Sequence, residues 1–224
     1  MPQPLSRFDS KAEFTLAARA SSYGVRNPYF ANHSAIATAA MEVIVEWGFI
    51  EFDIVMLFSH LCGGPHQDAF KVYAALKGDG PKSAALLAII EDKFIERDKE
   101  VFHVVRSWSK TCENKRNHIA HHVWGTITGR TDAVVLVDPM DYFLRTGDLA
   151  LSKVMVWTDN DFADAAQQCR SLSVCYHALS ELKSPADRDF VFDLLSKMPE
   201  IEARLHHLRE RKARTPREAT PQSD

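Results

Sequence analysis

The feature that most limits the fold of this chain is a helical pattern that runs unbroken from Ser34 to the sequence Gly63-Gly64-Pro65. Ser34 is a good N-cap residue, and a glycine pair followed by proline ends a helix. The pattern therefore predicts one long helix over residues 35–62. Most of its circumference is apolar, which indicates a helix that packs against other helices in a bundle.

One polar stripe interrupts that apolar circumference. On a helical wheel its members lie within about 40° of one another. They are Glu42, Glu46, Asp53 and His60. Such a stripe is either a carboxylate-rich wall of a metal or active site, or the solvated face that amphipathic helices ordinarily have. The second interpretation is favoured.

Further helical patterns follow, separated by glycine and proline. The chain predicts a helix over 67–77, a helical run over 83–123 with its likeliest break at 96–100, a helix capped at 158–160, and a last stretch over 186–212 in which Pro199 is a kink or a new first turn.

Between these helices the period changes. Residues 126–128, 133–137 and 153–157 are short, β-branched and separated by turn residues, which is typical of strands. The expected fold class is therefore mainly α, a helical bundle with a small antiparallel hairpin or sheet inserted at about 126–157. Residues 1–33 are expected to be a peripheral segment, with a short helix from Asp9 or Ser10 to near Arg19.

Composition excludes several classes of protein. A net charge of −3 argues against a protein that coats nucleic acid, although one local basic site remains compatible with it. The four cysteines form no CxxC pair, which is typical of reduced thiols in a cytoplasmic protein. The amino terminus lacks the pattern of a signal peptide, and charged groups interrupt the most apolar window, Val43 to Leu61, so no membrane association is expected.

The segment Lys115 to Gly125 carries the strongest chemical signal. It places an arginine, an asparagine and three histidines within seven positions, so a fixed positive charge lies beside groups that exchange protons near neutral pH. Arg116 lies about 40° from the centre of the apolar stripe of its helix, so it must reach solvent, enter an interface or pair with an anion. Glu113 and Asp53 are the candidate partners.

The spacing of Arg116 and His121 raises a geometric question. In a straight helix they lie about 140° apart and roughly 7.5 Å along the axis, so they are not side by side. They can cooperate if the helix breaks near Ala120, if the arginine stem curls, or if two subunits share the site. Asn117 lies one turn before His121 and can orient its ring.

Arg116-Asn117-x-x-Ala120-His121 resembles the R-x4–6-H motif of the HEPN superfamily, in which a polar residue, often asparagine, follows the arginine. The resemblance covers roughly residues 34–183, which are expected to form the HEPN-like domain; residues 184–212 are expected to be a helical extension and 213–224 a disordered tail. It implies a helical bundle that forms a homodimer through the motif helix. Many members are endoribonucleases that need no metal or other cofactor.

By this resemblance, Arg116 would hold the scissile phosphate, and His121 would act as general base or acid for attack by the RNA 2′-hydroxyl. Asn117 would orient the histidine or the phosphate. His122 also satisfies the motif spacing and is the alternative base. Lys115, Arg209, Arg211 and Lys212 are candidate RNA contacts. A toxin-like nuclease of this kind would also have an antitoxin or regulatory partner.

Two other interpretations stay open. Some members of the superfamily bind RNA, nucleotides or proteins without cleavage, and this chain could be such a module. A metal enzyme would instead use His118 and His122, four residues apart, with Glu42 or Glu46 as oxygen ligands. The chain lacks HExxH, and we expect that no metal is bound.

Overall fold

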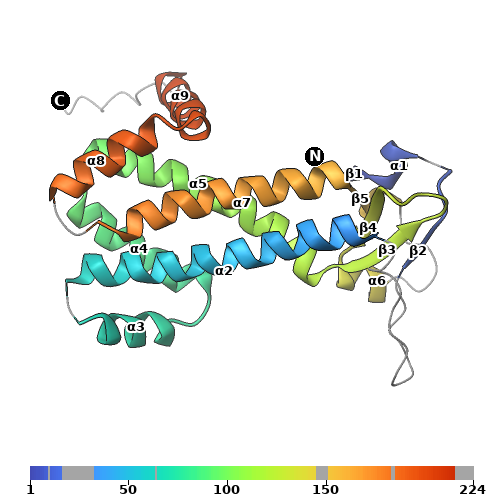
Figure 1. The fold of residues 1–224 in the computed structure, drawn as a ribbon, viewed down its shortest axis with the longest axis horizontal. Coiled ribbons are helices and arrows are strands. Elements are labelled where there is room, and N and C mark those ends of the chain that lie inside the picture. The colour runs from blue at the N-terminus through green and yellow to red at the C-terminus, as the bar shows by residue number, and fades with distance from the viewer. Residues whose placement is uncertain (10, 17–32, 64, 145–150, 183–184, 215–224) are drawn as a thin grey trace, which may run out of the picture. The chain divides into compact units, whose positions relative to one another are not determined.

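A computed structural model of the protein describes residues 1–9, 11–16, 33–63, 65–144, 151–182 and 185–214. The described chain is mainly helical and contains a small antiparallel sheet (Figure 1). This confirms the expected mainly α class with a small antiparallel sheet. None of the described helices is long and apolar enough to cross a membrane.

The helices follow the predicted pattern closely. The longer ones are α2 (Ser34–Cys62), α3 (His66–Ala75), α4 (Asp79–Lys93), α5 (Glu96–His121), α7 (Asp159–Ser180), α8 (Pro185–Ser196) and α9 (Pro199–Arg214). The short ones are α1 (Leu5–Phe8), α6 (Pro139–Leu144) and the 3-10 helix η2 (Leu151–Lys153). Pro199 begins a new helix instead of kinking an existing one, because proline is well suited to a first turn.

The break between α4 and α5 lies slightly before the predicted one. Phe94 is extended, with φ −102° and ψ 147°, and α5 begins at Glu96. Glu96 and Asp98 then occupy the first turn of α5, where acidic side chains interact favourably with the helix dipole. The charged run at 96–100 therefore starts a helix instead of interrupting one.

The chain forms two compact units, each built from two separate stretches. Unit 1 contains residues 1–52 and 109–174, and unit 2 contains residues 53–108 and 175–224. The boundaries fall inside α2, α5 and α7, so each of these helices contributes residues to both units. The domain boundaries expected at 33, 183 and 212 stay predictions.

Unit 1 contains the sheet. Its strands, in the order in which they pair, are β1 (Gln3–Pro4), β5 (Met155–Thr158), β4 (Ala133–Val137), β3 (Val123–Ile127) and β2 (Phe14–Leu16). Every neighbouring pair is antiparallel. All five residues of β4, the central strand, are buried.

Both edge strands come from the amino-terminal segment, which corrects the short helix expected there from Asp9 or Ser10. Phe14–Leu16 is a strand because it pairs with Gly125–Ile127 of β3 and packs against the apolar core of the sheet. Residues 17–32, where the rest of the expected helix falls, lie outside the described residues. A Cβ atom on Gly125 would lie 2.5 Å from Val135 Cγ2 and 2.9 Å from the Thr15 carbonyl oxygen, so this close approach of strands needs glycine.

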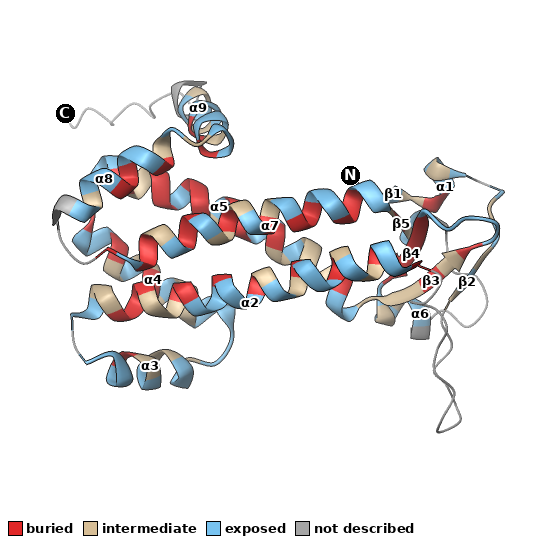
Figure 2. Ribbon diagram, viewed as in Figure 1, coloured by how far each residue is buried: buried red, intermediate tan, exposed pale blue. Residues whose placement is uncertain are grey.

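Unit 2 has its own helical core. Phe94 lies with its ring centroid 5.1 Å from Phe192 and 6.3 Å from Phe102, in edge-to-face arrangements that aromatic rings prefer. Figure 2 shows buried residues along the helices of this unit and on the strands of unit 1. Each unit therefore has an apolar core of its own.

Candidate functional site

The candidate site lies where α5 ends in unit 1. The His122 amide still donates to the His118 carbonyl oxygen at 3.1 Å, but His121 is the last helical residue. Val123 then pairs with Val137 at the start of β3, so the helix ends where pairing in the sheet begins. The Trp124 indole donates to the Ile119 carbonyl oxygen at 3.0 Å, which fixes the turn.

Arg116 is held by three groups around it. Its Nη1 donates to Asn117 Oδ1 at 2.9 Å, its Nη2 lies 3.5 Å from Glu51 Oε1, and its guanidinium carbon lies 5.9 Å from the centre of the Trp47 ring. The side chain is 25% exposed, so part of the guanidinium can still reach a ligand. It is therefore oriented and open at the same time.

The expected partners of Arg116 were wrong. Neither Glu113 nor Asp53 is within ion-pair distance of it in the structure; Glu51 is. Asp53 is buried in unit 2, where the Ser180 hydroxyl donates to its Oδ1 at 3.3 Å and His177 Nδ1 lies 3.6 Å away. The solvated-face interpretation of the α2 stripe is therefore wrong for Asp53, although Glu42 is exposed and pairs with Arg170 at 3.0 Å.

Sequence reasoning missed Trp47 and Glu51. The Trp47 indole donates to Glu51 Oε1 at 2.7 Å, and Trp47 itself is buried. The two residues lie four apart on α2, so one face of the helix presents both to Arg116. This i,i+4 pair of an indole donor and a carboxylate was the signal that could have pointed to them.

Asn117 contacts Arg116 through its side chain. Its side-chain oxygen accepts a hydrogen bond from Arg116, so the amide orients the arginine. Its expected role, to orient the histidine or the phosphate, stays a prediction.

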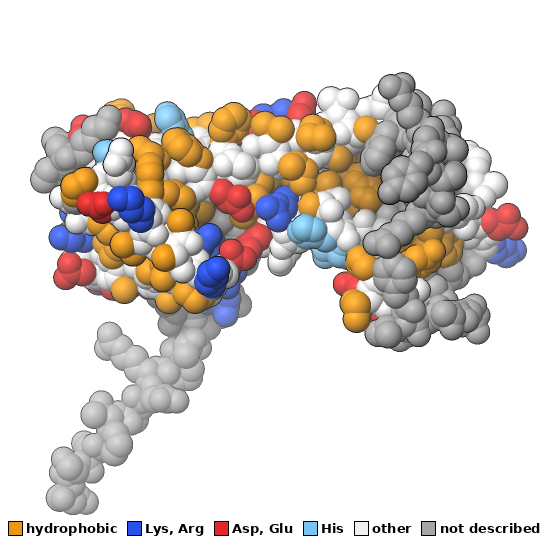
Figure 3. Space-filling view, turned by 90° about the horizontal axis from the view of Figure 1, so that it is seen from below, with side chains coloured by type: hydrophobic (Ala, Val, Ile, Leu, Met, Phe, Trp, Pro, Cys, Tyr) orange, Lys and Arg blue, Asp and Glu red, His pale blue; other side chains and the backbone are white. Residues whose placement is uncertain are grey.

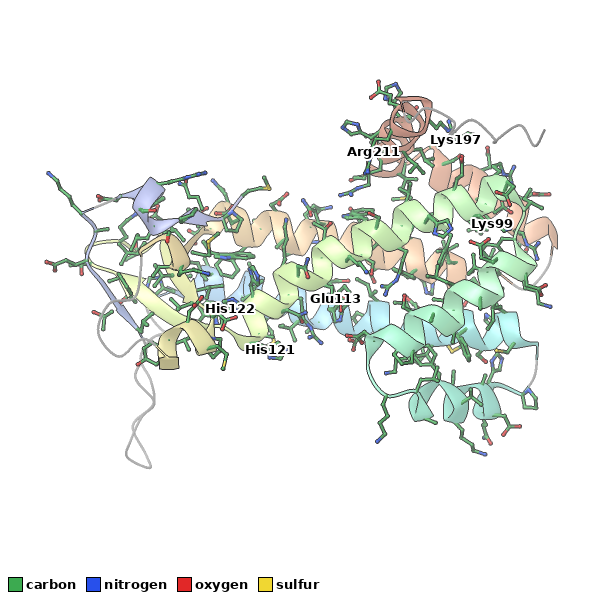
Figure 4. The ribbon with its side chains drawn as sticks, turned by 180° about the vertical axis from the view of Figure 1, so that it is seen from behind. Lys99, Glu113, His121, His122, Lys197 and Arg211 are labelled. Atoms are coloured by element: carbon green, nitrogen blue, oxygen red, sulfur yellow. The ribbon has the colours of Figure 1, made fainter. Side chains whose placement is uncertain are left out.

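The two candidate bases have different surroundings. His121 is exposed, and His122 is half-buried, with its ring centroid 4.5 Å from that of His118. Figure 4, which labels both, shows His121 on the outer side of the end of α5 and His122 nearer the sheet. His121 is therefore the residue that a substrate can reach without displacing packed side chains.

Burial lowers the pKa of His122 below its usual value of 6.5, and the nearby His118 lowers it further. Asp138 and the Asn117 backbone act in the opposite direction. The Nδ1 atom of His122 is buried and has no hydrogen-bond partner among the described residues. His122 is therefore a neutral imidazole near pH 7.

The remaining candidate RNA contacts lie in different places. Lys115 is 14% exposed and pairs with Asp164 at 2.8 Å and with Gln168 at 3.1 Å, so its charge is already satisfied. In unit 2, Arg209 lies 3.7 Å from Glu100, and Arg211 lines a cavity between α5 and α9. Lys212 lies in α9, but its side chain is outside the described residues.

A metal centre has little support in the donor set. Within the described ranges, no three His, Cys, Asp or Glu side chains are grouped so that they could hold a metal ion. His118 and His122 do lie together, but Glu42, one of the expected oxygen ligands, is paired with Arg170.

Comparison of the chain with models of protein families, with curated proteins and with solved structures gives no match.

Proposed function

We propose that this protein is a metal-independent endoribonuclease of HEPN type, which cleaves RNA by attack of the 2′-hydroxyl group at a composite site between two copies of the chain. The observation that supports this most strongly is the environment of Arg116. Three groups orient the guanidinium, its carboxylate partner Glu51 lies at the long distance of 3.5 Å, and the same helix ends in an exposed histidine.

The chemistry assigns one task to each side chain. Arg116 donates hydrogen bonds to the nonbridging oxygens of the scissile phosphate and stabilises the negative charge that develops there. His121 removes the proton of the 2′-hydroxyl, whose oxygen then attacks phosphorus. The 5′-oxygen then leaves as a hydroxyl group, with a proton that it takes from a protonated histidine side chain. The products are a 2′,3′-cyclic phosphate and a 5′-hydroxyl end, and no metal is needed.

In the free protein, Glu51 occupies the position beside Arg116 that the phosphate would take. Its side chain is 59% exposed, so an incoming phosphate can displace it from Arg116 at small cost. The Trp47 indole can keep its hydrogen bond to Glu51 or release it without leaving the core. Arg116 is thus prevented from folding into the core, and it remains available to RNA.

A second copy of the chain fits an apolar stripe on α2. Four large side chains on one face, within about 80° of arc, are between 48% and 61% exposed. They are Met41, Val45, Phe49 and Phe52. Such exposed apolar faces are typical of interaction sites. Hydrophobic side chains are also exposed on the face shown in Figure 3, with basic and histidine side chains among them.

This stripe refines the proposed dimer. The exposed residues of α5 within unit 1 are small or polar, such as Asn114, Ala120 and His121, and they offer little apolar surface. We therefore place α2 beside the motif helix in the dimer interface. Glu51 lies about 120° and Trp47 about 160° around α2 from the centre of this stripe, so a shared site also requires the second copy to contact the motif helix beside Arg116. Arginine and histidine from different chains can then act on one phosphate, which resolves the separation of about 140° along a single helix.

The decisive experiment is cleavage of single-stranded and structured RNA by the purified protein in EDTA, with analysis of the new ends. The wild type should leave 2′,3′-cyclic phosphates, and Arg116→Ala should lose about 100-fold to 1000-fold in rate. Arg170→Ala is the matched control, because Arg170 also pairs with a glutamate of α2 but lies outside the motif. Cleavage that survives Arg116→Ala, or that EDTA abolishes, would contradict the proposal.

The dimer is tested in the same preparations by sedimentation. The wild type should be a dimer, and Phe49→Glu should dissociate it and lose cleavage, because a charge replaces an exposed apolar contact. A wild-type monomer that cleaves RNA would show that the site is complete in one chain.

The alternative is a non-catalytic module that binds RNA, nucleotides or a protein. It would be favoured if the wild type binds RNA through Arg116 but leaves it intact. An antitoxin or regulatory protein that restrains the nuclease belongs to the proposal as well, because a ribonuclease with an exposed site has to be controlled in the cell that makes it.

A further inference from the structure

A second basic site lies in unit 2, in the cavity between α5 and α9. The cavity has a volume of about 420 Å³, which falls within the range of small-molecule sites. Five of its seven lining residues carry hydrogen-bond donors, and the other two, Val104 and Leu208, are apolar. The donors are His103, Ser107, Arg204, His207 and Arg211.

The face of α9 that lines this cavity has an unusual composition. Residues 204, 207, 208 and 211 follow the i, i+3, i+4, i+7 spacing of one helix face, which on a packed helix usually holds apolar side chains. Here two arginines and a histidine occupy three of the four positions. The buried contacts of α9 come instead from Ile201 and Leu205, so packing does not require the basic residues.

Arg204 is oriented by a rigid aromatic ring. Its guanidinium carbon lies 5.5 Å from the centre of the Trp108 ring, and Trp108 is almost completely buried. A guanidinium that lies over an aromatic ring keeps its N–H groups free to donate in its own plane. Within the described chain, no carboxylate lies within ion-pair distance of Arg204.

Carboxylates lie close to several other basic side chains in or near the cavity. His103 Nε2 lies 3.1 Å from Glu91, His207 Nδ1 lies 3.7 Å from Glu210, and Arg209 lies 3.7 Å from Glu100. These carboxylates limit the total positive charge, so the cavity suits one doubly charged phosphate better than a chain of phosphates. The apolar floor formed by Val104 and Leu208 suits the body of the molecule that carries it.

We propose that this cavity binds a small phosphomonoester with an apolar or aromatic body, of the size of a nucleoside monophosphate. Arg204 donates to the phosphate oxygens, and Arg211 and Ser107 line the same cavity. The site belongs to the unit that does not carry the Arg116 motif, and it is independent of the proposed ribonuclease.

The test is calorimetric titration of the full-length protein with adenosine 5′-monophosphate, with adenosine and inorganic phosphate as comparison ligands. The monophosphate should bind, and adenosine should not bind at the same concentrations. Arg204→Gln should weaken the binding by about tenfold or more, because a hydrogen bond to a charged group is lost. Arg209→Gln, on the same helix but outside the cavity lining, should leave the Kd unchanged.

Two more variants make the result decisive. Ser107→Trp places a large side chain in the cavity from an exposed position and should block binding without affecting the core. Arg116→Ala should bind the monophosphate normally, which separates this site from the motif. The proposal would be overturned if the monophosphate does not bind, if Arg204→Gln and Ser107→Trp bind it as well as the wild type, or if Arg116→Ala abolishes its binding.

An RNA hexamer serves as the last comparison ligand. If it binds through Arg204 while the monophosphate does not, the cavity is part of an RNA surface, and the proposal for a small phosphomonoester is wrong.

Discussion

Among the described residues of unit 1, two arginine–glutamate pairs have similar partners but different surroundings. Arg116 of α5 pairs with Glu51, and Arg170 of α7 pairs with Glu42; both glutamates are on α2. Arg170 has the shorter ion pair, 3.0 Å, and its second nitrogen bonds Gln167 on its own helix. It is 46% exposed, as expected for a surface pair that contributes little stability.

Arg116 differs in what lies behind it. A buried indole, an asparagine side chain and a long, exposed carboxylate contact hold it at 25% exposure, and three histidines follow within six residues. The shorter ion pair is therefore that of Arg170, although Arg116 is the arginine that packs against a buried indole. An arginine that is held in place but has only a distant, exposed carboxylate partner, as Arg116 has, is better suited to bind an incoming anion than one in a short ion pair.

The largest expected effect separates the two histidines beside Arg116. His121→Ala should lower kcat/KM for RNA by about 100-fold to 10,000-fold, because a general base or acid is removed. His122→Ala should lower it less, since the His122 ring is half-buried and its loss acts through packing. Rates are measured on one RNA substrate in EDTA. If His122→Ala is the inactive variant and His121→Ala is active, the catalytic histidine is His122.

A smaller effect tests the role of Glu51 directly. Glu51→Gln should strengthen the binding of RNA about twofold to fivefold, because it removes an exposed charge that competes with phosphate for Arg116. Glu42→Gln makes the same change at Arg170 and should leave the affinity unchanged. Binding is measured by fluorescence anisotropy in the Arg116-intact, His121→Ala background, which prevents cleavage. Equal gains in both variants would mean that only the overall charge matters.

The smallest effect concerns pH. Because the folded state lowers the pKa of His122 below 6.5, the unfolded state binds this proton more readily. The contribution of His122 to stability is therefore fully present above about pH 6.5 and is lost as pH falls toward the lower pKa of the folded state. The urea midpoint of the wild type should fall more between pH 7.5 and 5.5 than that of His122→Gln. Identical changes in the two proteins would show that His122 is not the group that titrates.

Sequence alone could predict the elements whose signals are local. The end of α2 follows from Gly63, which adopts φ 69°, and the cap of α7 follows from Thr158, whose hydroxyl donates to Asp161 at 2.8 Å. The buried strand β4 was predicted with its correct bounds, because its five residues are continuously apolar and lie between turns. Each of these signals is contained in a few neighbouring residues.

The errors concern partners that are distant in sequence. The segment Phe14–Leu16 is too short to be predicted as a strand from its sequence, and pairing with β3 fixes its conformation. Helical periodicity placed Arg116 at the edge of a buried face, but it could not identify Glu51, 65 residues earlier, as the partner. It also predicted an apolar α2 without showing that Met41, Val45, Phe49 and Phe52 would stay exposed.

The arrangement of the sheet has a consequence for the synthesis of the chain. Both edge strands, β1 and β2, emerge from the ribosome first, yet β2 pairs with a strand more than 100 residues later. At about 5–20 residues per second, β2 waits roughly 5–20 s for its partner to be made. Until then β2 has no strand to pair with, and an unpaired strand is a site for aggregation or chaperone binding. The nascent chain is therefore most vulnerable before the strand that follows the Arg116 motif has been made.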